Sequence, residues 1–212
     1  MHSGYPFSPA GRNAGPDTGT PIMATDWEAR DRERSAMPPR PAAVLADFDH
    51  LLPASGDALD LACGLGGNAL HLARHGLITR AWDSAATAID RLAAQACAER
   101  LALTAEVRDV VEHPPAASTF DAIVVSRFLD RALCPALAAA LRPGGLLFYE
   151  TFTRSRVTGR GPRSEHYRLG DNELLALFAG LRIRLYRDED RAGASDRGLR
   201  DIAQLVAQRP VD

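Results

Sequence analysis

The stretch Asp60-Leu-Ala-Cys-Gly64-Leu-Gly66-Gly67-Asn68 decides the fold, because a short apolar run enters a glycine-rich turn there. The run over 58–62 predicts a buried strand, and residues 66–75 predict a helix that Gly76 ends in the left-handed conformation. Gly64 and Gly66 lack a Cβ, so backbone can approach a ligand closely at the turn. The unit therefore predicts a ligand site at the end of a strand.

Strands and helices alternate along the rest of the chain. Further strands are predicted over 77–82, 103–107, 120–125 and 146–152. Two final strands are predicted over 181–186 and 202–206, and they are expected to pair as a hairpin. One helix is predicted after the N-cap Ser84 and one over Pro135–Leu141, and the break Arg142-Pro-Gly-Gly145 precedes the fifth strand. Asp171 is predicted to cap a helix that Gly180 ends. This pattern predicts an α/β fold with a doubly wound, mostly parallel seven-stranded sheet and a C-terminal antiparallel hairpin.

The N-terminal region has a different composition. Gly, Pro, Ser and Thr dominate residues 1–24, which predicts a disordered tail before a single domain over 25–212. A polar helix is predicted over Asp26–Ser35. Its Trp27 either stacks near a ligand or fills the groove between helix and sheet. A short amphipathic helix is predicted over 44–51, where Val44 and Leu51 share one side.

Composition excludes several classes of function. The 212 residues carry a formal charge of −2 and no lysine, so Schiff-base and P-loop-lysine chemistry are ruled out. No apolar run approaches the roughly 20 residues that span a bilayer, and the N-terminus lacks a secretory pattern, so we expect a cytoplasmic protein. The dispersed cysteines argue against a zinc–cysteine site. His71 and His75 share a helical face without a third ligand, so no metal is expected.

Two carboxylates follow neighbouring strands. Asp60 suits a ligand ammonium, and Asp83 suits two ribose hydroxyls, since hydrogen bonds to an ionised acceptor contribute about 1.5–3 kcal/mol each. The alternative is an NAD(P)-binding Rossmann oxidoreductase, because Gly64-x-Gly66-x-x-Ala69 satisfies the relaxed dinucleotide pattern. Asp60 argues against that alternative, because it would repel a pyrophosphate.

With these residues, the stretch 56–152 resembles the class I S-adenosylmethionine-dependent methyltransferases. The matching features are Asp60 with Gly64 and Gly66, then Asp83, Asp109 with Val110, Phe120-Asp121 and Arg142-Pro-Gly-Gly145. The resemblance implies a Rossmann-like methyltransferase fold with S-adenosylmethionine as cofactor. The cofactor-binding residues it implies are Asp60, Ala62, Gly64, Gly66, Asp83, Asp109, Val110 and Ser126. A weaker similarity to tellurite-resistance-type bacterial methyltransferases covers Ser126-Arg-Phe-Leu129, Tyr149–Thr153 and Gly161-Pro-Arg163. This similarity does not imply a particular substrate.

The residues at the end of the fourth predicted strand, Ser126-Arg127-Phe128, bear on which molecule accepts the methyl group. In the family that the sequence resembles, this strand end faces the transferred methyl group. It lacks the Asn/Asp-Pro-Pro-Tyr/Phe motif, and no proline precedes a cysteine, so DNA is disfavoured as substrate. The basic loop 154–168 is interpreted either as a solvated loop or as a lid that holds a small anionic substrate, with an RNA contact less favoured. Candidates for orienting the acceptor or removing its proton are Arg127, Glu150 and His166. A non-catalytic, methyltransferase-like regulatory protein remains the alternative from another class.

Overall fold

The computed structural model describes residues 39–211 of the chain. The tail predicted over 1–24, the helix predicted over 26–35 and Trp27 lie outside the described residues. No helix within 39–211 has the length and apolar character needed to cross a bilayer.

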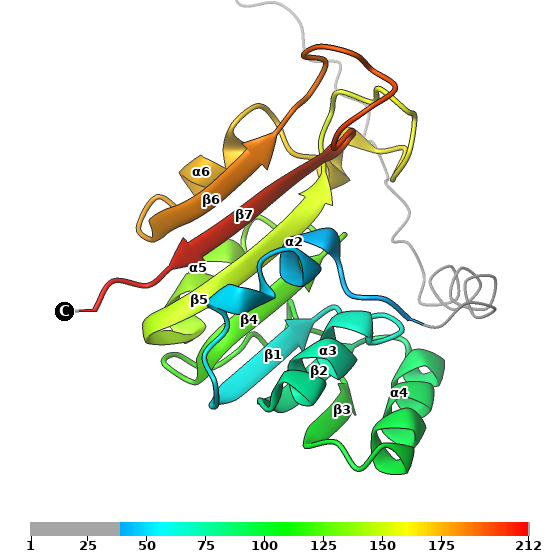
Figure 1. The fold of residues 1–212 in the computed structure, drawn as a ribbon, viewed down its shortest axis with the longest axis vertical. Coiled ribbons are helices and arrows are strands. Elements are labelled where there is room, and N and C mark those ends of the chain that lie inside the picture. Colours follow the sequence, from blue (N-terminus) through cyan, green and yellow to red (C-terminus); the bar gives the residue numbers. More distant parts are fainter. Residues whose placement is uncertain (1–38, 212) are drawn as a thin grey trace, which may run out of the picture.

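One seven-stranded sheet forms the centre of the molecule, in the order β3-β2-β1-β4-β5-β7-β6 (Figure 1). The strands are β1 (Asp57–Leu61), β2 (Ile78–Asp83), β3 (Leu103–Val107), β4 (Phe120–Ser126), β5 (Leu141–Phe152), β6 (Arg182–Asp188) and β7 (Ile202–Gln208). The first five pair in parallel, whereas β7 runs antiparallel to both β5 and β6. The predicted fold class is therefore confirmed, including the antiparallel pair at the C-terminus.

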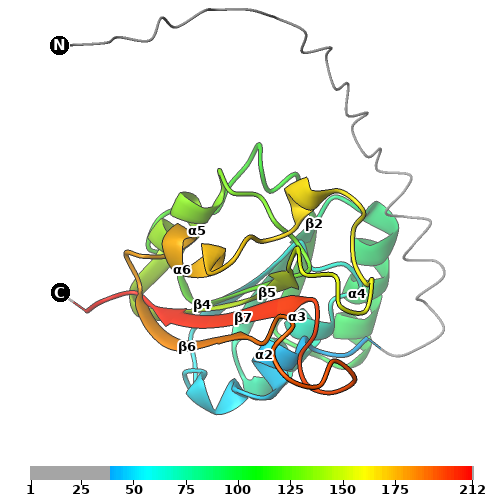
Figure 2. The same ribbon diagram turned by 90° about the horizontal axis from the view of Figure 1, so that it is seen from above.

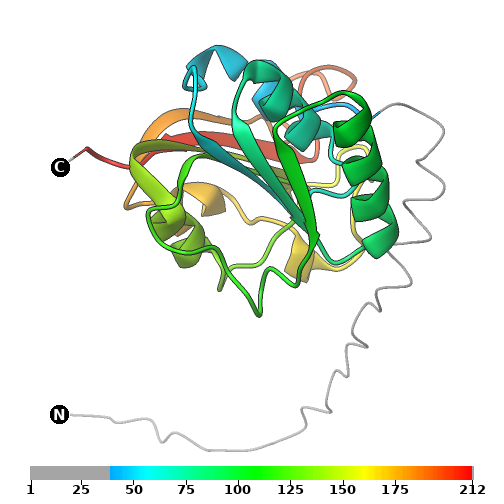
Figure 3. The same cartoon turned by 90° about the horizontal axis from the view of Figure 1, so that it is seen from below.

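Helices cover both faces of the sheet, as Figures 2 and 3 show. One face carries α2 (Ala43–Ala46), α3 (Gly67–His75) and α4 (Ala86–Ala98), and the other carries α5 (Cys134–Ala140) and α6 (Glu173–Leu177). Along β4, Val124 packs toward α2 while Ile123 and Val125 pack toward α5. Because both sides of the strand are buried, its residues have to be apolar in succession rather than in alternation.

Three helices differ from the prediction in their N-cap residue or their length. Ser84 does not cap α4; the N-cap position is Ala85, whose N–H donates to Asp83 Oδ1 at 2.9 Å. The helix predicted over 44–51 is only the single turn α2, followed by the 3-10 turn η1 (Asp49–Leu51). Helix α6 (Glu173–Leu177) has Asn172, in the left-handed conformation, rather than Asp171 at its N-cap, and it ends before the predicted Gly180. The Glu173 carboxylate accepts the Gly170 N–H.

The predicted break at Arg142-Pro-Gly-Gly145 lies inside β5, which begins at Leu141, and regular pairing with β4 resumes at Leu146, the predicted start of the strand. Leu141 pairs with Phe120, and an irregularity between Phe120 and Ala122 absorbs the turn. The Arg142 guanidinium contacts Asp121 Oδ2 at 2.5 Å and Asp57 Oδ2 at 2.8 Å. The residues that carry the family resemblance here therefore tie together the starts of β1, β4 and β5.

The loop over 153–170 is held by two buried charged residues. Asp201 accepts the backbone N–H groups of Val157, Thr158 and Arg160. Arg168 lies 1% exposed, and its guanidinium donates to the carbonyl oxygens of Thr153, Arg160 and Pro162. These bonds favour a fixed loop over the predicted lid, because opening it would strand a buried guanidinium and a buried carboxylate.

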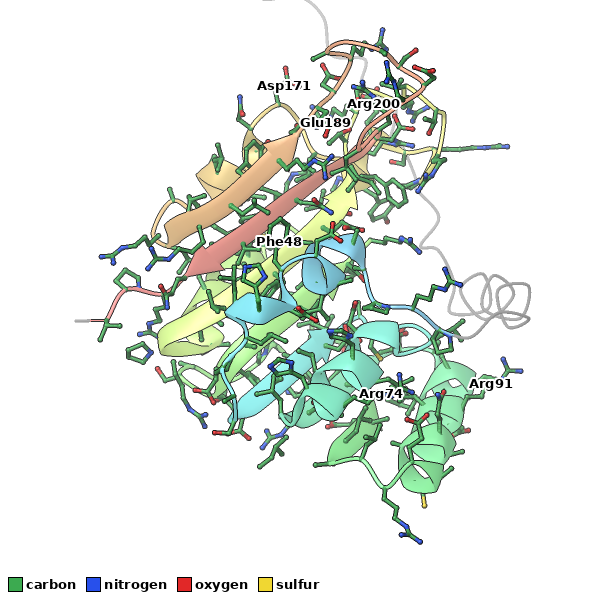
Figure 4. The ribbon with its side chains drawn as sticks, viewed as in Figure 1. Phe48, Arg74, Arg91, Asp171, Glu189 and Arg200 are labelled. Carbon is green, nitrogen blue, oxygen red and sulfur yellow. The ribbon has the colours of Figure 1, made fainter. Side chains whose placement is uncertain are left out.

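The neighbouring loop between β6 and β7 is built in the same way. Arg200 donates to the carbonyl oxygens of Glu189 and Asp190 at 3.2 and 2.8 Å, and also to those of residues 192, 194 and 197. Figure 4 shows Arg200 and Glu189 together in this loop. Arg191 joins the two loops through a 2.9 Å hydrogen bond to the Ser155 carbonyl oxygen.

The loop over 153–170 is expected to resist trypsin in the wild-type protein, although four of its arginines are exposed. Asp201→Ala leaves three N–H groups without their acceptor, so cleavage after residues 154, 156, 160 and 163 is expected to accelerate at least tenfold. Mass spectrometry of timed digests measures this rate, and cleavage after Arg74 in α3 serves as the control for global unfolding. Equal rates in both proteins would show that Asp201 does not hold the loop.

Candidate functional site

A cavity of about 430 Å³ lies where β1, β2, β3 and β4 end. The turn after β1 forms one wall, the tips of β2 and β3 form another, and the end of β4 faces them. Its lining residues are Pro39, Arg40, Ala62–Leu65, Gly67, Asn68, Asp83, Ser84, Arg108–Val111 and Ser126–Phe128. The ligand site predicted at a strand end is therefore a cavity at the carboxyl edge of the sheet, as is typical of doubly wound folds.

The two predicted glycines of the turn differ in what surrounds them. Gly64, at φ 51°, has no atom within 4 Å of where a Cβ would stand, so it leaves the cavity open for a ligand. At Gly66, φ 76°, a Cβ would stand 2.4 Å from Leu92 Cδ1. Gly66 therefore allows α4 to pack against the turn, and it does not line the cavity. Ala62, at φ 53°, shares the left-handed conformation and does line it.

Asp60 lies beneath the cavity rather than in it. The side chain is fully buried, Oδ2 accepts the Ala69 N–H at 2.9 Å, and Oδ1 accepts Asn68 Nδ2 at 3.2 Å. Burial raises the pKa of Asp60 to about 7, against the lowering effect of these two donors. Asp60 does not line the cavity, and the predicted contact with a ligand ammonium stays a prediction. Asp60 instead positions the first turn of α3.

Asp83 and Asp109 stand at the tips of β2 and β3 and both line the cavity. Asp83 accepts the Gly64 N–H at Oδ2, 2.8 Å away, while Asp109 Oδ1 accepts the Val111 N–H at 2.9 Å. Each carboxylate oxygen has two acceptor sites, so both side chains keep capacity for ligand hydroxyls or amines. Val110 lies buried beside Asp109 and supplies an apolar surface.

Ser126 completes the set that the structure brings together at the cavity. Its Oγ accepts Asn68 Nδ2 at 3.1 Å, which links the end of β4 to the first turn of α3. Of the eight predicted cofactor-binding residues, the cavity is lined by Ala62, Gly64, Asp83, Asp109, Val110 and Ser126. Asp60 and Gly66 support this set from behind.

The three predicted catalytic candidates are separated. Arg127 lines the cavity at φ 56°, and its N–H donates to the Glu150 carbonyl oxygen at 2.7 Å. The Glu150 side chain is buried away from the cavity, where Oε2 accepts the Val44 N–H at 3.0 Å and Gln204 Nε2 at 2.8 Å. His166 is exposed in the 3-10 turn η2 (Glu165–Tyr167), does not line the cavity, and stacks edge-on against Tyr167. Of the three candidates, Arg127 lines the cavity, and the catalytic roles stay predictions.

The cavity is also lined by residues that were not among the predicted site residues, including Arg40, Asn68, Arg108 and Phe128. Arg108 lies with its guanidinium carbon 4.0 Å from the centre of the Trp82 ring, and its Nε donates to the His113 carbonyl oxygen at 2.9 Å. Arg108 and Phe128 adjoin the predicted residues Asp109 and Arg127, so adjacency could have suggested them. Arg40 has no such signal.

The remaining predicted features have ordinary surroundings. Cys63 is buried in the turn, as expected for a small filler, and His71 Nε2 lies 3.2 Å from Asp49 Oδ2. Among residues 39–211 no three His, Cys, Asp or Glu side chains are arranged to hold a metal ion.

The comparisons with known proteins agree with this geometry. Residues 58–145 match the family model of a methyltransferase domain. A search of curated proteins found no match. The matched stretch begins in β1 and ends within β5, so it contains the strands and turns that form the cavity.

Solved structures share the fold over most of the chain. TehB from Haemophilus influenzae superposes with a TM-score of 0.66 at 18% identity, covering 86% of this chain and 67% of that one. A geranyl diphosphate C-methyltransferase from Streptomyces coelicolor A3(2), solved with Mg²⁺, geranyl diphosphate and S-adenosyl-L-homocysteine, gives 0.61 at 18% identity and covers 99% and 93%. A structure described for the conversion of a disulfide bond into a thioacetal group during echinomycin biosynthesis gives 0.64 at 25% identity and covers 89% and 92%. The predicted Rossmann-like methyltransferase fold is confirmed.

Substituting the two glycines separately is expected to cost different amounts of stability. Gly64→Ala meets only the left-handed backbone strain, about 1 kcal/mol. Gly66→Ala adds overpacking against Leu92, so its total cost is about 3 kcal/mol. Urea denaturation of both variants measures the difference. Equal free energies of unfolding would contradict the packing role assigned to Gly66.

Asp60 is expected to make stability fall as pH rises. Between the ordinary carboxyl pKa of 3.8 and the folded value of about 7, the folded protein keeps a proton that the unfolded chain has lost. The stability that this proton confers is therefore lost as pH rises toward 7, by about 3 kcal/mol between pH 5 and pH 8. Asp60→Asn is expected to flatten this dependence in urea denaturation at both pH values. Parallel pH dependence in the two proteins would contradict the assignment.

Proposed function

Since the chain carries a methyltransferase domain, whose methyl donor is S-adenosylmethionine, we propose that it methylates a small anionic acceptor bound beside Arg127. The domain match and the fold support the general activity. The acceptor class, the residues of the site and their roles are the parts that belong to the proposal.

The division of charge across the cavity carries the proposal. Asp83 and Asp109 supply carboxylates on one side, while Arg127 supplies a guanidinium at the end of β4. A nucleoside offers a ribose diol and a neutral base to the two carboxylates, so an anionic acceptor is favoured beside Arg127 rather than beside Asp83 and Asp109. A guanidinium binds carboxylate or phosphate groups through paired hydrogen bonds.

The cavity residues fit a nucleoside sulfonium. Gly64 leaves the space beside the turn open, and Asp83 keeps acceptor capacity at the adjacent strand tip. Val110 offers an apolar surface next to Asp109, which is suited to a base whose amine binds the carboxylate. The six cavity-lining residues named above would therefore hold the donor, and Asp60 would act on it only through Asn68.

The chemistry requires orientation more than proton transfer. A sulfonium supplies a reactive methyl group, and alignment of the reacting groups can lower a barrier by about 7–11 kcal/mol. Glu150 is committed to Val44 and Gln204, and His166 does not line the cavity, so neither candidate base reaches it. Arg127 would hold an acceptor that is already anionic and needs no base to remove a proton.

Asp83→Asn is expected to weaken binding of S-adenosylhomocysteine at least tenfold, or by about 1.4 kcal/mol, because the ribose loses its ionised acceptor. Isothermal titration calorimetry measures the affinity. Arg74→Gln, an exposed substitution on α3 (Figure 4), is the control and is expected to bind as the wild type does. Wild-type protein that ignores S-adenosylhomocysteine and binds NADH would overturn the donor assignment.

The acceptor class can be tested with methyl-labelled S-adenosylmethionine and a cell extract. Label is expected in small molecules retained by an anion-exchange resin, and Arg127→Gln is expected to reduce it at least tenfold while binding of S-adenosylhomocysteine stays within twofold. Label in RNA, in protein or in uncharged small molecules would contradict an anionic small acceptor. No transfer to any fraction, despite donor binding, would favour a non-catalytic role.

A further inference from the structure

The loop that follows β5 has a stretch, residues 153–164, whose charged side chains are all positive (Figure 1). These exposed side chains, which we call the basic loop surface, are Arg154, Arg156, Arg160 and Arg163. Within residues 39–211, none of the four guanidinium groups lies within ion-pair distance of a carboxylate. Because the whole chain has a formal charge of −2, this surface is a local concentration of positive charge.

One buried cation gathers the basic loop surface around itself. The Arg168 guanidinium donates to the carbonyl oxygen of Thr153, 2.6 Å away, and to that of Arg160. The Arg156 guanidinium in turn donates to the Arg163 carbonyl oxygen. The loop is therefore folded back on itself, and its four exposed arginines begin from neighbouring parts of a fixed backbone.

This arrangement brings like charges together. Burial lowers the pKa of Arg168, and the nearby charge of Arg156 lowers it further, against the raising effects of Asp201 and Glu165. Like charges that share a small surface repel one another, and a bound anion relieves the repulsion. The neighbouring loop over 189–201 mixes acidic residues with its arginines, so the excess is confined to the basic loop surface.

An exposed aromatic ring lies next to this charge. Tyr167 is 38% exposed and belongs to η2, which begins two residues after Arg163. Its ring meets that of His166 edge-on, with 5.1 Å between the centroids. The Arg131 guanidinium holds this turn by donating to the His166 carbonyl oxygen at 2.5 Å. Within the loop, no other large apolar side chain that the structure describes is exposed.

We propose that the basic loop surface binds the phosphodiester backbone of a single-stranded nucleic acid, with one base stacked on Tyr167. Guanidinium groups bind phosphates through paired hydrogen bonds, and an exposed aromatic ring can stack on the face of any unpaired base. This inference concerns binding, and it does not depend on the proposed methyl acceptor.

Two other polyanions fit the surface less well. A membrane surface is favoured by apolar side chains that insert beside the positive charge, and the loop exposes only Tyr167. An acidic protein is favoured by several apolar and aromatic anchors at the centre of the interface, which the loop also lacks. Ribose and deoxyribose strands share the phosphates and the base faces, so both are expected to bind.

Fluorescence anisotropy with labelled oligouridylate and oligothymidylate of about 12 nucleotides tests the proposal. The wild type is expected to bind both with a Kd of roughly 1–100 μM at physiological salt, and the slope of log affinity against log salt is expected to be about −3 for four phosphate contacts. Arg160→Gln combined with Arg163→Gln is expected to weaken both ligands at least tenfold and to make the slope shallower by about 1.4. Neither side chain donates a hydrogen bond within residues 39–211, so the double variant is expected to keep the wild-type melting temperature. If that temperature falls, Arg154→Gln alone replaces it, with an expected change in slope of about 0.7.

The charge-matched control combines Arg74→Gln with Arg182→Gln, which removes two exposed arginines from α3 and β6. It is expected to bind within twofold of the wild type and with the same slope. Tyr167→Ala is expected to weaken the single strands at least fivefold without changing the slope, because stacking involves no phosphate. Duplex RNA of the same length, whose base faces are covered, is expected to bind Tyr167→Ala and the wild type equally.

Each remaining outcome counts against the proposal. Equal weakening by the loop variant and the control would show a general charge effect, and unchanged binding by Tyr167→Ala would refute the stacking. Phosphatidylserine vesicles or polyglutamate that displace the oligonucleotide at equal charge concentration would assign the surface to a membrane or to an acidic protein instead. No binding of the wild type at about 1 mM protein and low salt would overturn the inference altogether. Binding of S-adenosylhomocysteine, which tests the proposed function, is measured separately and can fail without affecting these results.

Discussion

The buried carboxylate of Asp60 is the interaction on which the rest of the site depends. It accepts the Ala69 N–H and Asn68 Nδ2, and so fixes the direction in which α3 leaves the turn. Asn68 in turn donates to Ser126 Oγ on β4 and accepts the Ala42 N–H, so it connects α3 to both segments. The arrangement carries a cost, because burial penalises the ionised form and raises the pKa of Asp60 to about 7.

Several described arginines of this lysine-free chain have one of two kinds of surroundings. Arg168 and Arg200 are buried, and each donates to several carbonyl oxygens, which orders two long loops. Arg142 joins the starts of three strands. Arg40 and Arg127 border the cavity instead. A guanidinium has five donors in a fixed plane, so the same residue type holds backbone carbonyl oxygens in the loops and, in the proposed function, an anion at the cavity.

The glycines of the turn also separate into tasks that the motif alone does not distinguish. Gly64 keeps ligand space open, Gly66 accommodates Leu92 from α4, and Gly67 accommodates the backbone of Arg40. The glycines of the motif therefore let the turn, α4 and the backbone at Arg40 pack closely together, and they also leave room for a nucleoside. Substitution at each glycine affects a different neighbour, and for this reason the three positions are not interchangeable.

The sequence by itself determined the strands, their alternation with helices, the left-handed end of α3 at Gly76 and seven of the cavity-lining residues. These follow from apolar runs and from turn residues, which act over a few neighbouring positions. Only the tertiary structure decided that Glu150 serves the N-terminal segment, that Arg142 lies within a strand, and that Arg40 reaches the cavity. Val44 and Glu150 are 106 positions apart in the sequence. Contacts over such separations depend on how strands and loops pack, and the residue pattern within a few positions does not indicate them.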